Sequence, residues 1–253
     1  SQPGSGNAQA RGRVLREDGD LRGAEAAFRR CVDRGSVRAL GDWAGLLYQR
    51  EGVTPEEITE AFALLCGAHD KFIWHKDLDA LAPVLILDSM VERCDPAAIE
   101  AGAERADEQG SAAGAWNLAW ALRGKGDLPE AVVAFRRAAE RGFDEAWMKG
   151  AGVCLEMGDA VAAEAMARDG DRAGSASASN TLGIILDEQN RGDEALEAYK
   201  RADAGGDGDG SFNMGIELLD RGDLRGAEDA LQRAVEREAD NAEDALAHVR
   251  RVI

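Results

Sequence analysis

Aromatic residues are scarce in this chain of 253 residues and make up 5% of it. A single large core needs more bulky apolar side chains, whereas closely packed helices accept many small ones. Proline is also rare, and two of the five prolines follow helix-capping residues, at Thr54-Pro55 and Asp95-Pro96. Long alternating runs of Val, Ile and Thr are absent, so nothing predicts a β-sheet. The sequence therefore favours thin layers of helices.

The four cysteines, Cys31, Cys66, Cys94 and Cys154, form no Cys-x-x-Cys pair. Scattered thiols of this kind predict reduced, buried cysteines and a cytoplasmic location. No apolar run reaches the ~18 residues of a membrane span, and the chain has no recognisable signal peptide. We expect residues 1–7 to be a flexible leader or an expression remnant.

Basic residues are outnumbered, 30 against 48 acidic ones, and the formal net charge is −18. The excess is concentrated in residues 51–110 and 151–253, which carry net charges of −10 and −12. Such charge repels nucleic-acid phosphates and anionic lipids. We therefore expect neither nucleic acid nor a membrane as a partner. The acidic bias reflects either simple solvation or a preference for basic partners.

An internal repeat of 32 residues organises the chain, and we call this spacing the repeat period. Four columns of equivalent positions carry it. They are Leu122, Cys154, Leu186 and Leu218; Ala131, Ala163, Ala195 and Ala227; Ala119, Ala151, Gly183 and Gly215; and Gly110, Gly142, Gly174 and Gly206. Self-similarity at one fixed spacing is typical of supersecondary units that stack on one another.

The unit at residues 112–142 shows what these columns do. Gly126 ends a first helix, because glycine readily takes the left-handed conformation that follows a helix. Asp127 then caps a second helix, and we expect it to form a capping box with Glu130. The second helix carries one buried stripe, formed by Ala131, Phe135 and Ala138. Such a hairpin must stack on its neighbours to bury its apolar face.

The order of small, Leu, small and large residues, followed by Gly-Asp, Ala, a large aromatic residue and Ala, resembles the tetratricopeptide repeat. The Ala-Ala-Glu-Arg-Gly sequence at 138–142 is similar to the related Sel1-like repeat. The resemblance implies an all-α fold: a right-handed superhelical solenoid of about seven helix-turn-helix repeats plus a C-terminal capping helix, over residues 8–253. The repeats are expected at 8–35, 37–66, 80–110, 112–142, 144–174, 176–206 and 208–238, and the cap at 242–253.

Two segments depart from the period. Residues 67–79 are expected to form an irregular insertion. Asp203–Ser211 is a polar, glycine-rich joint, which we expect to be either a hinge or a loose loop. If the array bends, we expect the bend at one of these two places.

Residues that suggest catalysis are few. The insertion contains His69, Asp70, His75 and Asp77. These imitate part of a metal or phosphohydrolase site, but metal hydrolysis requires a larger convergent set of ligands. Residues 207–211 are similar to the start of a calcium loop, but Leu218 stands where such a loop requires a bidentate Glu. We therefore expect no enzyme activity, no metal and no cofactor.

The resemblance also implies a binding groove. In the family, the groove is lined by first-helix residues two before and two after the Leu-small pair. With their polar neighbours, the candidates in this chain are Trp116, Asn117, Trp120, Met148, Lys149, Asn180, Ile184, Phe212, Asn213 and Ile216. Large apolar side chains would anchor a ligand and amides would bond its backbone, unless these aromatics are ordinary packing between helices. The family subtype that clamps acidic C-terminal tails uses Lys, Asn and Arg at these positions, so we do not expect it here.

We predict a cytoplasmic protein–protein interaction scaffold that captures a peptide or helix of a partner in this groove. The alternative is a regulatory or sensor module of a larger multidomain protein. An enzyme built around His69, His75 and Asp77 is a third hypothesis, with only those residues in its favour. End repeats expose apolar faces unless they are capped, so a homo-oligomer through the end repeats is a further alternative.

Overall fold

The computed structural model describes residues 5–47, 50, 52–72, 90 and 94–252. Every regular element in these residues is an α-helix, as the composition predicts. The chain divides into two compact units, Ser1–Gly124 and Lys125–Ile253. Where the array bends stays a prediction.

The first unit has six helices in the described residues. They are α1 (Ser5–Glu17), α2 (Leu21–Val32), α3 (Val37–Leu47), α4 (Pro55–Phe72), α6 (Pro96–Glu108) and α7 (Ala112–Lys125), the last of which ends at the boundary. Each helix from α1 to α4 packs against the next, and α4 packs extensively against α6. Thr54 and Asp95 precede α4 and α6, so the two helix starts predicted at Thr54-Pro55 and Asp95-Pro96 are confirmed.

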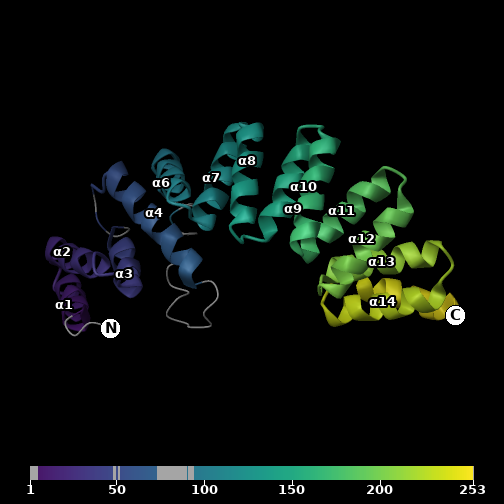
Figure 1. The fold of residues 1–253 in the computed structure, drawn as a ribbon. Coiled ribbons are helices and arrows are strands. Elements are labelled where there is room, and N and C mark those ends of the chain that lie inside the picture. Colours follow the sequence, from purple (N-terminus) through teal and green to yellow (C-terminus); the bar gives the residue numbers. More distant parts are fainter. Residues whose placement is uncertain (1–4, 48–49, 51, 73–89, 91–93, 253) are drawn as a thin grey trace. The chain divides into compact units, whose positions relative to one another are not determined.

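The second unit is a regular array of helices. They are α8 (Leu128–Glu140), α9 (Glu145–Glu156), α10 (Ala160–Ala173), α11 (Ala176–Glu188), α12 (Gly192–Ala204), α13 (Gly208–Asp220), α14 (Leu224–Glu236) and α15 (Ala242–Val252). Each of these helices packs against the next, and Figure 1 shows them as successive hairpins. The predicted all-α repeat solenoid is confirmed, while its superhelical hand stays a prediction.

The core of this unit lies between the helices of each pair and between neighbouring pairs. The Ala column at 163, 195 and 227 is fully buried. At the C-terminal end, Leu246 and Val249 of α15 join Leu231 of α14 in one buried cluster. Helix α15 thus covers the last pair, as expected of a capping helix.

The corners between helices recur at half the repeat period. The last corner has a second residue with a positive φ, Asn241, and at every corner one residue at the equivalent position has a positive φ. The residues at this position are Gly110, Gly126, Gly142, Gly158, Gly174, Asn190, Gly206, Gly222 and Glu238. At the corner after α10, the amide of Gly174 donates to the carbonyl of Asp171 at 3.0 Å, and the amide of Ser175 to that of Gly170 at 3.0 Å. This Schellman motif satisfies carbonyl groups that the end of a helix leaves open.

The residue after the left-handed one often caps the next helix. Side-chain oxygens of Asp159, Ser175, Asp207 and Asp223 accept from the amides of Ala162, Ala178, Gly210 and Gly226 at 2.9, 3.2, 2.6 and 3.0 Å. Asp127 stands at the equivalent position, but its side chain makes no capping bond, so the capping box predicted with Glu130 is wrong. At those four corners the third residue is Gly or Ala, whereas Glu130 adds a second negative charge to this helix end.

A complete capping box forms elsewhere, at the start of α4. The Glu57 amide donates to Thr54 Oγ1 at 3.3 Å, and the Thr54 amide donates to Glu57 Oε2 at 2.9 Å. Two otherwise open backbone donors are satisfied reciprocally. Pro55 lies at the first position of this helix, where its missing amide costs nothing.

Small residues allow neighbouring helices to approach closely. A Cβ atom added at Gly170 would lie 2.4 Å from Ala178 Cβ and 2.7 Å from Trp147 Cγ. One added at Gly183 would lie 2.4 Å from Tyr199 Cε1. Distances this short are not compatible with a side chain, so these positions require glycine for packing.

Helix α4 extends into the segment that we expected to be irregular. It continues to Phe72, so residues 67–72 of the insertion predicted at 67–79 are helical. Ala68 in this stretch is 6% exposed, and its burial extends the apolar face of the helix. Residues 73–79, with His75 and Asp77, lie outside the described residues. Likewise α1 begins at Ser5, inside the leader expected over 1–7.

The joint at Asp203–Ser211 is not a loose loop, and whether it acts as a hinge stays a prediction. Helix α12 runs to Ala204 and α13 begins at Gly208, which leaves a corner of the usual length. A Cβ atom at Gly210 would lie 2.4 Å from Ala202 Cβ. Glycine at this position permits close packing, which the sequence pattern cannot distinguish from flexibility.

Two equivalent carboxylates join neighbouring pairs. Asp203 accepts hydrogen bonds from Ser211 Oγ at 2.7 Å, Arg233 Nε at 2.9 Å and Arg237 Nη1 at 2.7 Å. Asp171, one repeat period earlier, accepts from Ser179 Oγ at 2.6 Å and Arg201 Nε at 2.7 Å. Although burial raises the pKa of each Asp, these donors hold both pKa values below the usual range.

Acid is expected to weaken the array through these two carboxylates. A group whose pKa is depressed in the folded state stabilises it above the unfolded pKa, near 4, and the contribution is lost as the pH falls through the folded pKa. Asp203→Asn should therefore lower the melting temperature at pH 7 and narrow the gap between pH 7 and pH 3, as measured by circular dichroism. Asp193→Asn is the control, because Asp193 pairs with Arg221 but is 95% exposed and should change little. Equal effects of both substitutions would contradict this account.

Glycine packing can be tested with two residues of adjacent helices. Gly170→Ala should destabilise the protein by about 1–3 kcal/mol, because the added methyl overpacks the contact between α10 and α11. Gly152→Ala is the control: no atom lies within 4 Å of the added Cβ, so it should stabilise α9 by about 0.5–1 kcal/mol. Urea denaturation measures both, and a stable Gly170→Ala protein would show that the close approach is not required.

Candidate binding surface

In the second unit, the first helix of each pair (α9, α11, α13 and the terminal α15) is packed differently from the second (α8, α10, α12 and α14). Helix α9 contacts α11, α11 contacts α13, and α13 contacts α15, whereas the second helices make fewer contacts with one another. The first helices therefore form a continuous layer. Side chains one repeat period apart lie side by side on it.

Seven of the ten predicted groove residues lie on this layer, and we call them the first-helix surface. They are Met148, Lys149, Asn180, Ile184, Phe212, Asn213 and Ile216. Ile184 is 41% exposed and Asn180 is buried, while the other five are half-buried. Phe212 packs partly against the core of α12 to α15, so part of its ring serves packing.

An amide pair links two helices within this surface. Asn213 Nδ2 donates to Asn180 Oδ1 at 2.9 Å, which joins α13 to α11. The second polar atom of each side-chain amide, Nδ2 of Asn180 and Oδ1 of Asn213, takes no part in this hydrogen bond. The structure thus brings apolar and hydrogen-bonding groups together on three neighbouring helices.

The other three candidates lie on α7, in the first unit. Trp120 is 36% exposed and Trp116 is half-buried, and their rings meet edge to face with centroids 5.8 Å apart. The Arg123 guanidinium lies 5.4 Å from the centroid of the Trp120 ring. Asn117 Nδ2 donates to the carbonyl of Ala113 at 2.8 Å, one turn back on the same helix. These residues form a small surface of their own.

The part of the proposed catalytic constellation that the structure describes has a structural role. Asp70, at the end of α4, accepts hydrogen bonds from the amides of Ala112 and Ala113, both at 2.9 Å. It thereby caps the N-terminus of α7 from 42 residues away. Burial raises the pKa of Asp70, but hydrogen bonds from His69, Ser111 and these amides outweigh it and leave the pKa below its usual range. Within the described residues, no three His, Cys, Asp or Glu side chains are grouped to hold a metal ion.

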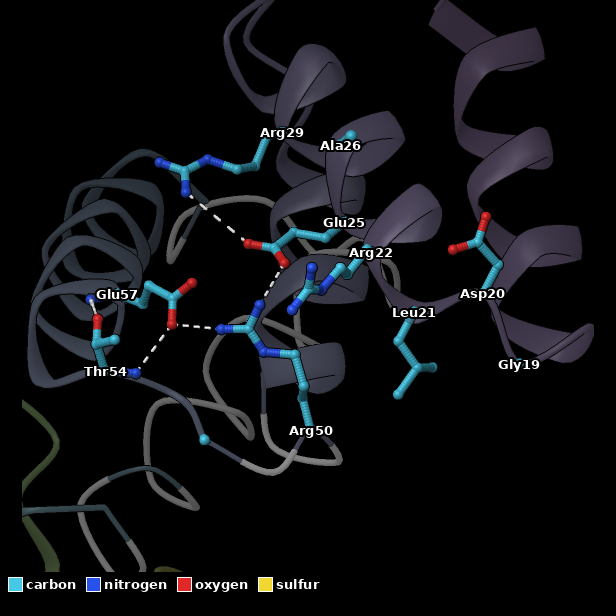
Figure 2. Close-up of a pocket in the computed structure, with 11 residues that line it drawn as sticks. Gly19, Asp20, Leu21, Arg22, Glu25, Ala26, Arg29, Arg50, Thr54 and Glu57 are labelled. Carbon is cyan, nitrogen blue, oxygen red and sulfur yellow. Dashed lines mark hydrogen bonds and ion pairs between the residues drawn. The ribbon is translucent and has the colours of Figure 1, made fainter.

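A cleft of about 820 Å³ opens in the first unit between α2 and α4 (Figure 2). Arg50 bridges two carboxylates across it, with Nη1 2.6 Å from Glu25 Oε2 and Nη2 paired with Glu57. Arg29 pairs with Glu60 at 2.5 Å. The Glu57 hydrogen bond raises the pKa of Arg50. Arg29 and Arg50 are thus paired with carboxylates of the same unit, and these ion pairs link α2 to α4 across the cleft.

A further column lies on the first helices and was not among the predicted site residues. Glu156, Glu188 and Asp220 are exposed and end α9, α11 and α13, each one repeat period after the last. The negative charge near these helix ends also affects a buried side chain, Tyr199. Burial raises the pKa of Tyr199, and the charges of Asp187, Glu217 and Glu188 raise it further. The repeat period alone could have revealed this column in the sequence. That its three residues lie on neighbouring helices of one layer is known only from the structure.

None of the helices in the described residues has the combination of length and apolarity that a bilayer crossing needs. A family model described as Tetratricopeptide repeat matches residues 212–251. Among solved structures, the chain is similar to c5321, a protective antigen present in uropathogenic Escherichia coli strains displaying an SLR fold. The identity is 17% over 97% of this chain and 56% of that chain, with a TM-score of 0.55.

The chain is also similar to YrrB, a TPR protein with an unusual peptide-binding site, at 17% identity over 76% of this chain and 99% of that chain, with a TM-score of 0.44. No curated protein sequence matches it significantly. The family match and the likeness to the SLR fold confirm the resemblance seen in the sequence columns.

The capping role of Asp70 can be tested by amide exchange. Asp70→Ala should remove the acceptor for the Ala112 and Ala113 amides, at a cost of about 1 kcal/mol. Their hydrogen exchange should then be roughly fivefold faster, while amides of the second unit keep their rates. Glu56→Ala, an exposed residue in the first turn of α4, is the control. Unchanged exchange at Ala112 and Ala113 would remove the capping role.

Proposed function

Because the chain is a repeat solenoid of the tetratricopeptide and Sel1-like type, we propose that it is a protein–protein interaction scaffold that captures a segment of a partner on the first-helix surface. One observation carries the proposal. Three adjacent first helices present exposed Ile184, half-buried Met148 and Ile216, and the Asn180–Asn213 amide pair in one layer. Apolar anchors beside backbone-bonding amides suit a peptide or helix better than a small polar substrate.

We propose a similar contact role for Trp116, Asn117 and Trp120 on α7. Tryptophan supplies a large contact area, and Trp120 at 36% exposure keeps part of its ring available. This surface belongs to the first unit and is proposed separately from the first-helix surface.

A regulatory or sensor module within a larger protein remains the alternative. It uses the same surface to hold a segment of its own polypeptide rather than a separate partner. The cytoplasmic location, the absence of enzyme activity and a homo-oligomer through the end repeats stay predictions.

The proposal is tested by altering the surface without altering the fold. Ile184→Asp combined with Ile216→Ala places a charge on the first-helix surface and removes an anchor beside it. Capture of partner proteins from a lysate, quantified by mass spectrometry, should fall at least about tenfold, or about 1.4 kcal/mol of binding free energy.

The matched control is Val161→Asp combined with Val133→Ala. These valines are 81% and 53% exposed on α10 and α8, outside the first-helix layer. The control should capture the same proteins as the unaltered chain, and circular dichroism should show that both variants are folded. Equal capture by the two variants would rule out the first-helix surface as the binding site.

A further inference from the structure

Apolar side chains are exposed on the second helices α8 and α10 and at the corner between α9 and α10. Val161 is 81% exposed, Val133 53% and Met157 42%. Pro129 and Ala165 are exposed beside them. We call these five residues the second-helix patch. Single apolar residues on a surface need no explanation, whereas a contiguous group of them marks an interaction site.

The patch is continuous across α8 and α10. Each of these helices contributes two patch residues that are four apart in the sequence and therefore neighbours one turn apart. The two on α10 follow the two on α8 by one repeat period. The two helices are adjacent, because Arg136 of α8 pairs with Asp169 of α10. Patch residues at equivalent places therefore lie side by side.

The repeat also places Met157 in this patch. Two periods later, the equivalent of Met157 is Arg221 and the equivalent of Pro129 is Asp193. An ion pair of 2.7 Å joins Arg221 to Asp193, so the corner after α13 reaches back to the start of α12. The corner after α9 stands in the same relation to the start of α8, which brings Met157 beside Pro129.

The second helices of the next two pairs carry charges at the equivalent places. These residues are Asp193 and Glu197 on α12 and Arg225 and Asp229 on α14. The same backbone thus accepts charged side chains at these exposed positions, and the fold does not require apolar ones on α8 and α10. Apolar residues at solvent positions break the local pattern without a structural gain, which points to function.

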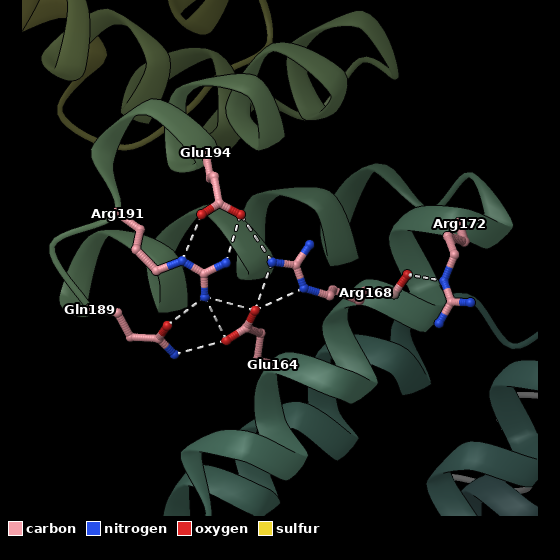
Figure 3. A network of polar contacts seen from close by, with 6 residues as sticks. All are labelled: Glu164, Arg168, Arg172, Gln189, Arg191 and Glu194. Carbon is pink, nitrogen blue, oxygen red and sulfur yellow. Dashed lines mark hydrogen bonds and ion pairs between the residues drawn. The ribbon is translucent and has the colours of Figure 1, made fainter.

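The corner after α11 shows what the patch lacks. Gln189 stands there at the place of Met157 and donates to Glu164 Oε2 at 3.1 Å. Arg191 binds Glu164 at 2.9 Å and Glu194 at 2.6 Å, in the network that Figure 3 shows. At that corner, the exposed side chains hold neighbouring helices together. The Met157 thioether has no proton to donate in such a bond, so its exposed surface is left for an apolar contact.

The patch lies in the less charged part of the second unit. Residues 125–173 contain 7 basic and 10 acidic side chains, whereas residues 174–253 contain 9 and 18. Two copies of a chain with a net charge of −18 repel each other. This repulsion is weakest where the acidic excess is smallest. Within the second unit, a second copy is therefore tolerated best at residues 125–173.

Charges on both sides of Val133 make α8 complementary to itself. Glu130 precedes Val133 by three residues, and Arg136 follows it by three. Glu130 is exposed, and the half-buried Arg136 uses Nη1 for Asp169, which leaves further N–H donors on its guanidinium. Antiparallel α8 helices of two copies that cross at Val133 bring Glu130 of each copy to Arg136 of the other. A parallel crossing would instead set like charges against each other.

We propose that the second-helix patch binds a second copy of this chain about a two-fold axis, with the two α8 helices antiparallel. In such an isologous interface the same patch lies on both sides, so the apolar residues cover one another and the charge pair forms twice. The interface involves two helices and one corner of each copy, so the dimer is small in area and depends on concentration. It leaves the first-helix surface of each copy available, and it does not depend on the proposed function.

Sedimentation equilibrium of the full chain, at concentrations up to about 200 µM, tests the patch. The unaltered chain should show a reversible equilibrium between monomer and dimer. Val161→Asp combined with Val133→Ala should raise the dimer dissociation constant at least about tenfold, because it buries a charge and removes apolar contact. The matched control is Ile184→Asp combined with Ile216→Ala, which alters the first-helix surface and should leave the dissociation constant unchanged.

Two charge reversals test the antiparallel arrangement. Glu130→Arg sets two arginines against each other in its own dimer, and Arg136→Glu does the same with two glutamates. Each variant alone should dimerise at least about fivefold more weakly than the unaltered chain. An equimolar mixture of the two should regain the dimer, because every altered residue then faces an opposite charge. Circular dichroism checks that each variant is folded, and a gain on mixing separates the interface from a loss of fold.

Three outcomes would overturn the proposal: an unaltered chain that stays monomeric to about 200 µM, equal dissociation constants for the valine and isoleucine variants, or no gain when the charge variants are mixed. The two tests of the second unit are separable, because they use the same pair of variants with opposite expectations. The valine variant should lose the dimer and keep partner capture, and the isoleucine variant should do the reverse. Capture that survives the isoleucine variant sinks the proposed function alone.

Discussion

A left-handed residue at a fixed spacing is the constraint on which the second unit depends. It recurs at every half period from Gly126 to Glu238, and after α9 the bonds around it close each helix at nearly the same length. Helices of equal length that pack pairwise keep equivalent residues at the same height in successive pairs. The residues of the first-helix surface and the carboxylates of Asp171 and Asp203 lie in rows for this reason. A surface assembled from three helices needs no loop to hold it in place.

Much of this fold could be predicted, because most corners between helices contain a glycine that the sequence shows directly. Glycine reaches positive φ without strain, so its columns reveal the repeat. The shorter interval is hidden, because Asn190 and Glu238 take the same conformation without being glycine. Asparagine visits that region more readily than most residues. At the last corner, the Glu238 amide donates to the carbonyl of Val235 and the Ala239 amide to that of Ala234, and these bonds hold the conformation. Residue type alone does not show a conformation that neighbouring bonds impose.

The candidate surface was predictable in position but not in exposure. Asn180 and Ile184 lie one turn apart on α11, yet one is buried and the other is 41% exposed. The difference arises from α13, whose Asn213 lies against Asn180, and no local pattern encodes that contact. The helical continuation of α4 to Phe72 is a similar case. Asp70 accepts hydrogen bonds from backbone amides far along the chain. The sequence does not show these bonds, so a charged residue at this position suggests a loop.

Left-handed residues at equal spacing also limit how an array like this can grow or shrink. Removing one helix together with one corner would leave every other turn and helix intact, because left-handed residues recur at the same spacing in both kinds of corner. It would nevertheless exchange first and second helices downstream, so that second helices would take the places of first helices beside the first-helix surface. Only gains or losses of whole helix pairs preserve the parity of the array. The side chains of the surface therefore repeat only after a full period of two helices. The backbone conformation already repeats after half that period, at every corner.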